Sequence, residues 1–143
     1  ENFELLQRNV NGATLYNVAV SPSRFVTEVQ FYRNKGKNKG LHSTVPTRGR
    51  DIIIVPALPF KYFLDKNPTK IKIDCEGAEY SFFTPSELPE AVKGLIIEYN
   101  LTRKGERSSA IALHASMAML GWDCVKEPVF NTKAWATLAS YRR

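Results

Sequence analysis

The sequence is poor in cysteine and lacks any long hydrophobic run. Its two cysteines, Cys75 and Cys124, lie far apart and without metal-ligand spacing, so they indicate neither a disulfide framework nor a zinc site. No apolar run approaches the roughly 20 residues of a membrane span, and the first four residues contain neither a basic nor an apolar leader segment. These absences predict a soluble, cytoplasmic protein with free, buried thiols, no bound metal and no membrane partner.

Acidic residues are missing from residues 33–50, which we call the basic loop. This stretch contains six arginines and lysines and three glycines, and it accounts for the formal net charge of +6. We predict a flexible loop, and the alternative to a merely solvated loop is that it steers an anionic partner such as a phosphorylated sugar or a nucleic acid. Because the loop contains no aromatic residue for base stacking, we favour a solvated loop over a nucleic-acid interface.

The rest of the composition is typical of one globular domain over residues 1–143, with 43% hydrophobic and 24% charged residues. Apolar residues at helical spacing predict helices, and alternating or continuous apolar runs predict strands. Helices and strands follow one another along the chain, which indicates the α/β class. The predicted helices are residues 2–10, 59–66, 78–83 and 110–120, and the predicted strands are residues 14–20, 25–32, 51–56, 70–73, 92–99, 122–125 and 134–141.

The last predicted helix, residues 110–120, carries little polar surface, so we expect it to be mostly buried. Ser108 or Ser109 is the expected N-cap, and Gly121 is the expected end. His114 lies within this helix among apolar neighbours. A lone histidine in such surroundings is typical of a packed helix residue, and we favour that role over a role as a ligand.

The chain is organised around the stretch Lys70–Tyr80. Ile71 and Ile73 alternate as in a strand, and Asp74 follows where that strand would end. A glycine-containing turn and further carboxylates come next. In an open α/β sheet the side chains at the carboxyl ends of the strands face a crevice. The pattern therefore predicts a site that contains Asp74.

The segment Lys72–Glu79 resembles the signature Lys-Ile-Asp-x-Glu-Gly-Ala-Glu of the FkbM family of S-adenosylmethionine-dependent methyltransferases. Upstream, Asn2, Leu5, Asn9 and Ala19 also match the pattern of that family. The resemblance implies a Rossmann-like methyltransferase sheet with helices on both faces and a C-terminal antiparallel strand pair. It also implies S-adenosylmethionine as cofactor and O-methylation of a hydroxyl group on a small molecule or glycan.

One part of the family pattern is missing. Family members begin with a strand and a Gly-x-Gly turn that hold the methionine part of the cofactor, and a second strand ends in an acidic residue for the ribose. The sequence contains no Gly-x-Gly, so we expect it to enter the fold after the second strand, as a fragment or a natural remnant. Activity would then need the missing part or a partner chain, and we expect the chain to form a homo-oligomer through uncovered strand edges.

Asp74 is the first candidate for catalysis, in which it would orient or deprotonate the acceptor hydroxyl. Lys72 lies two residues earlier on the same strand face, and Glu98 ends the neighbouring predicted strand, so the three side chains would form a charged cluster. The alternative is an ion-pair network that only fixes the turn. The sequence leaves both interpretations open.

The resemblance also implies positions that bind the ligands. Ala19 and Asp74 would contact the cofactor, and Glu76 and Glu79 would line the substrate rim or cap the helix that follows. The competing hypothesis for the whole chain is a catalytically inactive Rossmann remnant that acts as an interaction or nucleic-acid-binding module through the basic loop.

Overall fold

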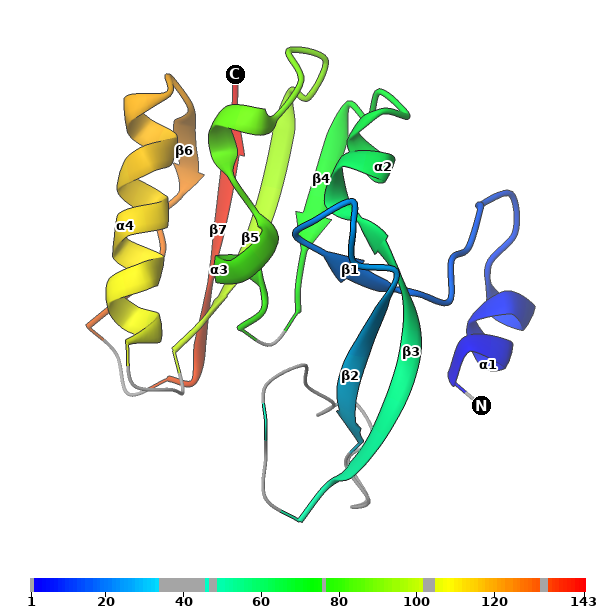
Figure 1. Ribbon diagram of the computed structural model, residues 1–143. Helices are drawn as coiled ribbons and strands as arrows, with labels where there is room; N and C mark the ends of the chain where they lie inside the picture. The colour runs from blue at the N-terminus through cyan, green and yellow to red at the C-terminus, as the bar shows by residue number, and fades with distance from the viewer. Residues whose placement is uncertain (1, 34–45, 47–48, 76, 102–104, 132–133) are drawn as a thin grey trace.

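The computed structural model describes residues 2–33, 46, 49–75, 77–101, 105–131 and 134–143. Over these residues the chain is a mixed α/β protein with two sheets and four α-helices (Figure 1). The α/β class predicted from the sequence is confirmed at this level. In chain order the elements are α1 (Asn2–Asn9), β1 (Ala19–Ser21), β2 (Glu28–Arg33), β3 (Asp51–Pro59), α2 (Phe60–Leu64), β4 (Lys70–Ile73), α3 (Glu79–Phe82), a 3-10 turn (Pro85–Glu87), β5 (Gly94–Asn100), α4 (Glu106–Met119), β6 (Asp123–Lys126) and β7 (Ala136–Arg142).

The larger sheet has four strands in the order β4-β5-β7-β6. β4 and β5 run parallel, with Lys70 opposite Gly94 and Ile73 opposite Ile97. β7 is antiparallel to both β5 and β6. The predicted antiparallel strand pair near the end of the chain is therefore confirmed. The predicted signature strand, residues 70–73, coincides with β4.

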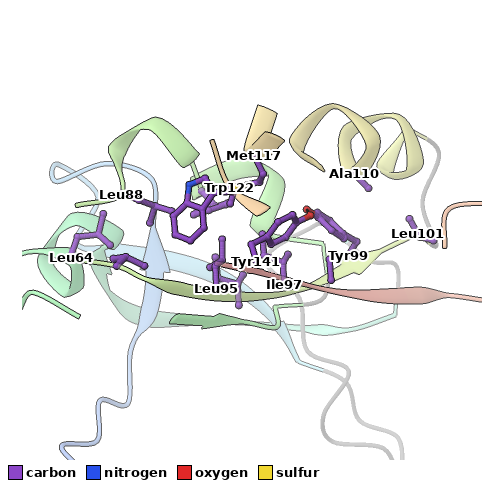
Figure 2. Close-up of a cluster of buried hydrophobic side chains, with 14 residues drawn as sticks. Leu64, Leu88, Leu95, Ile97, Tyr99, Leu101, Ala110, Met117, Trp122 and Tyr141 are labelled. Carbon is purple, nitrogen blue, oxygen red and sulfur yellow. Dashed lines mark hydrogen bonds between the residues drawn. The ribbon is translucent and has the colours of Figure 1, made fainter. Parts of the chain in front are cut away.

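The buried core lies on one face of this sheet. Side chains two residues apart on a strand share a face, which brings Leu95, Ile97 and Tyr99 of β5 together under the helices. Ala110 and Met117 of α4 are fully buried against this cluster. Figure 2 shows these side chains between the sheet and the helical layer. Each large buried side chain contributes about 1.5–3 kcal/mol, so this face accounts for much of the stability of the domain.

Within the described residues, the opposite face of the same sheet is largely exposed. Lys70, Lys72, Gly94 and Ile96 contribute to the lining of a shallow hollow of about 340 Å³ on this face, and Ile96 is 40% exposed. The helices that the sequence predicts on both faces therefore remain a prediction for this second face.

The smaller sheet has three strands in the order β1-β3-β2, with β1 parallel and β2 antiparallel to β3. The prediction of a strand over residues 14–20 is largely wrong, because only Ala19–Ser21 pairs with β3. Tyr16 packs edge-on against the rings of Tyr62 and Phe63. This contact holds the chain around Tyr16 next to α2 instead of β3. β2 also begins three residues later than predicted, at Glu28.

The long helix α4 differs from its prediction at one end and in its burial. It begins at Glu106 after Gly105, whose φ of 93° suits glycine, so neither Ser108 nor Ser109 is the N-cap. The helix is not mostly buried, since only Glu106, Ala110 and Met117 are buried and Ile111 and Met119 are exposed to solvent. Its end before Gly121 is confirmed. No helix in the described part of the chain is long and apolar enough to cross a membrane.

Candidate functional site

Two charged side chains meet at the carboxyl end of β4. Lys72 and Asp74 lie two residues apart and so share one side of the extended backbone. The Lys72 Nζ and Asp74 Oδ2 atoms are 2.9 Å apart, and the two side chains are 60% and 42% exposed. The hydrogen bond to Asp74, followed by the negative charge of Asp74, raises the pKa of Lys72. The raised pKa keeps Lys72 protonated at neutral pH, and both side chains are open to a ligand.

The turn after this pair depends on Gly77. Its φ of 96° is in the left-handed region, which side chains other than glycine rarely adopt. The Gly77 amide donates a hydrogen bond of 2.9 Å to the Glu79 carboxylate, and the Ala78 amide donates one of 3.1 Å to the Cys75 carbonyl. These bonds fold the chain back on itself and place α3 directly after the turn.

Glu79 fixes the turn to the neighbouring strand. Its side chain has no exposed surface, and its Oε1 accepts a hydrogen bond of 3.0 Å from the amide of Asn100, the last residue of β5. Its Oε2 accepts hydrogen bonds from the Gly77 amide and from the Cys75 thiol, the second with a length of 3.3 Å. A buried carboxylate needs such donors, because an unpaired buried charge is costly. Of the two predicted roles, a place on the substrate rim and capping of the helix that follows, the full burial of Glu79 disfavours the first, and its hydrogen bonds fix the turn just before α3.

Tyr80 adds a second bond to the same residue of β5. Its hydroxyl donates to the Asn100 carbonyl at 2.6 Å. Burial, followed by the charge of Glu79, raises the pKa of Tyr80, and burial likewise raises the pKa of Cys75. Both groups therefore stay protonated and act as donors. We call the contacts of Glu79 and Tyr80 with Asn100 the signature clamp.

The other predicted site residues lie in different places. Glu98 of β5 is on the same sheet face as Lys72, and its charge makes a small contribution to the raised pKa of Lys72. Ala19 lies in the other sheet, where it pairs with Ala57. Glu76 falls outside the described residues, as does most of the basic loop. The structure therefore brings together Lys72, Asp74 and the side of β5 that carries Glu98.

Sequence reasoning missed two features. Tyr80 and Asn100 had no assigned role, although Tyr80 directly follows the signature and is the kind of residue that anchors a turn when buried. The fold also brings His114 to Cys124 and Glu127, with their ligand atoms within 4.8 Å of one another. No sequence spacing indicated this second group, because its members come from a helix, from a later strand and from the residue after that strand.

Comparison with protein families gives one result that covers most of the chain. The family model described as the methyltransferase FkbM domain matches residues 1–125. This range contains the signature turn, the clamp and the Lys72–Asp74 pair. No curated protein and no solved structure matches the chain.

Proposed function

Because the chain belongs to the FkbM methyltransferase family, we propose that it serves in O-methyl transfer from S-adenosylmethionine to a hydroxyl group of a small molecule or glycan. The observation that carries the proposal is the exposed Lys72–Asp74 pair at the carboxyl end of β4. The conformation of the turn beside it is fixed by the buried Glu79. A charged pair on a rigid support is the arrangement that positions a reacting group.

The residues of the chain fit the acceptor side of such a site better than the cofactor side. Asp74 supplies an exposed carboxylate oxygen, which can accept a hydrogen bond from a hydroxyl group or face a cationic sulfonium. A cradle for the methionine part would need closely spaced glycines, and the sequence contains no Gly-x-Gly. S-Adenosylmethionine, when bound, supplies an electrophilic methyl group. Ala19 and Asp74 are the positions that we assign to it by family resemblance.

The acceptor chemistry follows from the charges of the pair. An Asp74 carboxylate oxygen accepts a hydrogen bond from the hydroxyl group of the methyl acceptor. It takes the hydroxyl proton as the hydroxyl oxygen becomes the nucleophile. The Lys72 ammonium pairs with Asp74 before the reaction and offsets the negative charge that develops on the acceptor oxygen. Glu98 lies on the same face and adds to the field that holds Lys72 protonated. The signature clamp keeps the turn, and with it Asp74, fixed to β5.

The order β4-β5-β7-β6 supports a Rossmann-like sheet of the methyltransferase type. In such a sheet two central strands lie between the strand that contains Ala19 and the signature strand. Within the described residues β1 and β4 are each at the edge of their own sheet, as this arrangement requires. We propose that the two sheets are parts of one Rossmann-like sheet that further strands would complete.

Titration with S-adenosylhomocysteine, followed through backbone amide shifts of the 143-residue chain, tests the proposal. We expect weak binding, with a dissociation constant on the order of 1 mM, since the glycine cradle is missing. The shifts should concentrate at Asp74, Gly77 and Asn100, and Asp74→Asn should reduce them.

The matched control is Asp65→Asn, because Asp65 forms a similar exposed pair with Lys61 on α2. This variant should leave the titration unchanged. Saturable shifts that avoid the signature turn, or no shift at several times that concentration, would contradict the proposed site. Low-micromolar affinity would contradict our account of the cofactor side.

A further inference from the structure

A second cluster of reactive side chains lies at the β6 edge of the larger sheet, which is the opposite edge from the signature strand β4. His114 comes from the middle of α4, Cys124 from β6, and Glu127 from the residue after β6. One ligand atom of each lies within 4.8 Å of the others. We propose that these three side chains form a binding site for Zn²⁺.

An irregularity in β6 explains why the two β6-side ligands share a face. Cys124 pairs with Tyr141 and Lys126 pairs with Ser140, so β6 has one extra residue between these pairs. Such a bulge shifts the alternation of side chains by one position. Without it, residues three apart would point to opposite faces of the strand. With it, Cys124 and Glu127 both lie on the side of the sheet that α4 covers.

The distance between two of the ligand atoms already suits a metal ion. The His114 Nε2 and Glu127 Oε2 atoms are 3.4 Å apart. Bonds of about 2.0–2.1 Å from zinc to nitrogen and oxygen at a tetrahedral angle place those atoms about 3.3 Å apart. The Cys124 sulfur lies within 4.8 Å of the other ligand atoms and would have to approach them to about 3.6 Å to share the ion.

The other ring nitrogen of His114 has its own partner. Its Nδ1 lies 2.7 Å from the Tyr141 hydroxyl, which in turn lies 2.6 Å from the Tyr99 hydroxyl. When Nδ1 donates to Tyr141, the lone pair is on Nε2, which faces Glu127. A hydrogen bond of this kind behind the ligand is typical of histidines that bind metals, because it fixes the ring and its tautomer.

The set of donor atoms selects the metal. One sulfur, one imidazole nitrogen and one carboxylate oxygen suit Zn²⁺, whereas Mg²⁺ and Ca²⁺ prefer oxygen alone. Binding replaces the proton of the Cys124 thiol, which leaves to solvent, by a sulfur–zinc bond. Three protein ligands leave a fourth position for water, as in zinc sites that are not purely structural. The ion would join α4 to β6 and so hold the edge strand in place.

Titration of the chain with Co²⁺ and then Zn²⁺ tests the site. Co²⁺ should give a thiolate-to-metal absorption band that an equal amount of Zn²⁺ removes. Cys124→Ser should abolish the band. Cys75→Ser should keep it, because the Cys75 thiol donates a hydrogen bond to Glu79 at the other edge of the sheet. A folded wild-type chain without the band, or a band that persists in Cys124→Ser, would overturn the proposal.

A surface variant tests the same site without risk to folding. Glu127 is 70% exposed, so Glu127→Gln should fold normally and weaken Zn²⁺ binding by at least about tenfold. Glu90→Gln, at another exposed position, should leave the affinity unchanged. Zn²⁺ should also raise the melting temperature of the wild type and of Glu90→Gln more than that of Glu127→Gln. Equal affinity in the two variants would show that Glu127 is not a ligand.

Discussion

Two isoleucines in the two sheets have very different surroundings. Ile97 of β5 has no exposed surface, whereas Ile54 of β3 is 57% exposed. Both strands have neighbours on two sides, because β5 lies between β4 and β7 and β3 lies between β1 and β2. The difference is the layer above the strand. Ile97 lies beneath the helical layer of the core, as Figure 2 shows, and in the described part of the smaller sheet only Ser21 and Ala57 are buried.

The two sheets therefore differ in what their described residues support. The larger sheet carries the core, the signature turn and the proposed zinc site, each supported by buried partners. The smaller sheet leaves apolar side chains of β3 exposed. Exposed apolar side chains on one strand face are typical of a surface that another protein segment covers. The predictions that follow test how far the two sheets differ.

The largest expected effect is on the state of association. We expect the chain to form a homo-oligomer through its uncovered strand edges, and we expect the second copy to cover the exposed Ile52 and Ile54 of β3 as well. Sedimentation at micromolar concentration should give at least twice the mass of one chain. Ile54→Lys should shift the protein to the monomer, because a charge on that face opposes burial. Ile111→Lys, at a similarly exposed position on α4, should not. A well-folded wild-type monomer would contradict the prediction.

The next effect concerns stability. Ile97→Ala should lower the free energy of unfolding by about 2–5 kcal/mol, since it opens a cavity in a closely packed core. Ile54→Ala should change it by less than about 0.5 kcal/mol in the monomer, because the side chain is already largely in water. Urea denaturation of both variants provides the measurement. Similar losses in the two variants would mean that the smaller sheet is covered as well as the larger one.

Local patterns predicted some elements well and others poorly. β4 and the start of α3 follow from alternating isoleucines and a glycine turn, which are local features. The strand expected over residues 14–20 depended on a distant partner, and Tyr16 instead packs beside α2. The Lys72–Asp74 contact was predictable because the two residues are close in sequence. The contact of His114 with the β6 edge depends on a bulge that no periodicity reveals.

A smaller loss of stability should follow from a change in the signature clamp. Glu79→Gln keeps the shape of the side chain but turns one accepting oxygen into a donor that faces the amide of Gly77 or Asn100. We expect a loss of about 1.5–3 kcal/mol in the free energy of unfolding, the usual contribution of a hydrogen bond to a charged group. Amide exchange should accelerate at Gly77 and Asn100. Unchanged stability would show that the clamp contributes little to holding the turn.

The smallest effect on stability, and a large one on activity, should come from Asp74→Asn. Because Asp74 is 42% exposed and its partner Lys72 is also exposed, the variant should keep the wild-type free energy of unfolding within about 0.5 kcal/mol. In an assembly that transfers methyl groups to a hydroxyl acceptor, its turnover should fall by about a hundredfold, since a positioned base is lost. Labelled-methyl transfer to a panel of sugars and small hydroxyl compounds measures the turnover, and Asp65→Asn should behave as the wild type. An Asp74→Asn protein that unfolds more easily yet turns over normally would assign Asp74 to the turn and leave the chemistry to other residues.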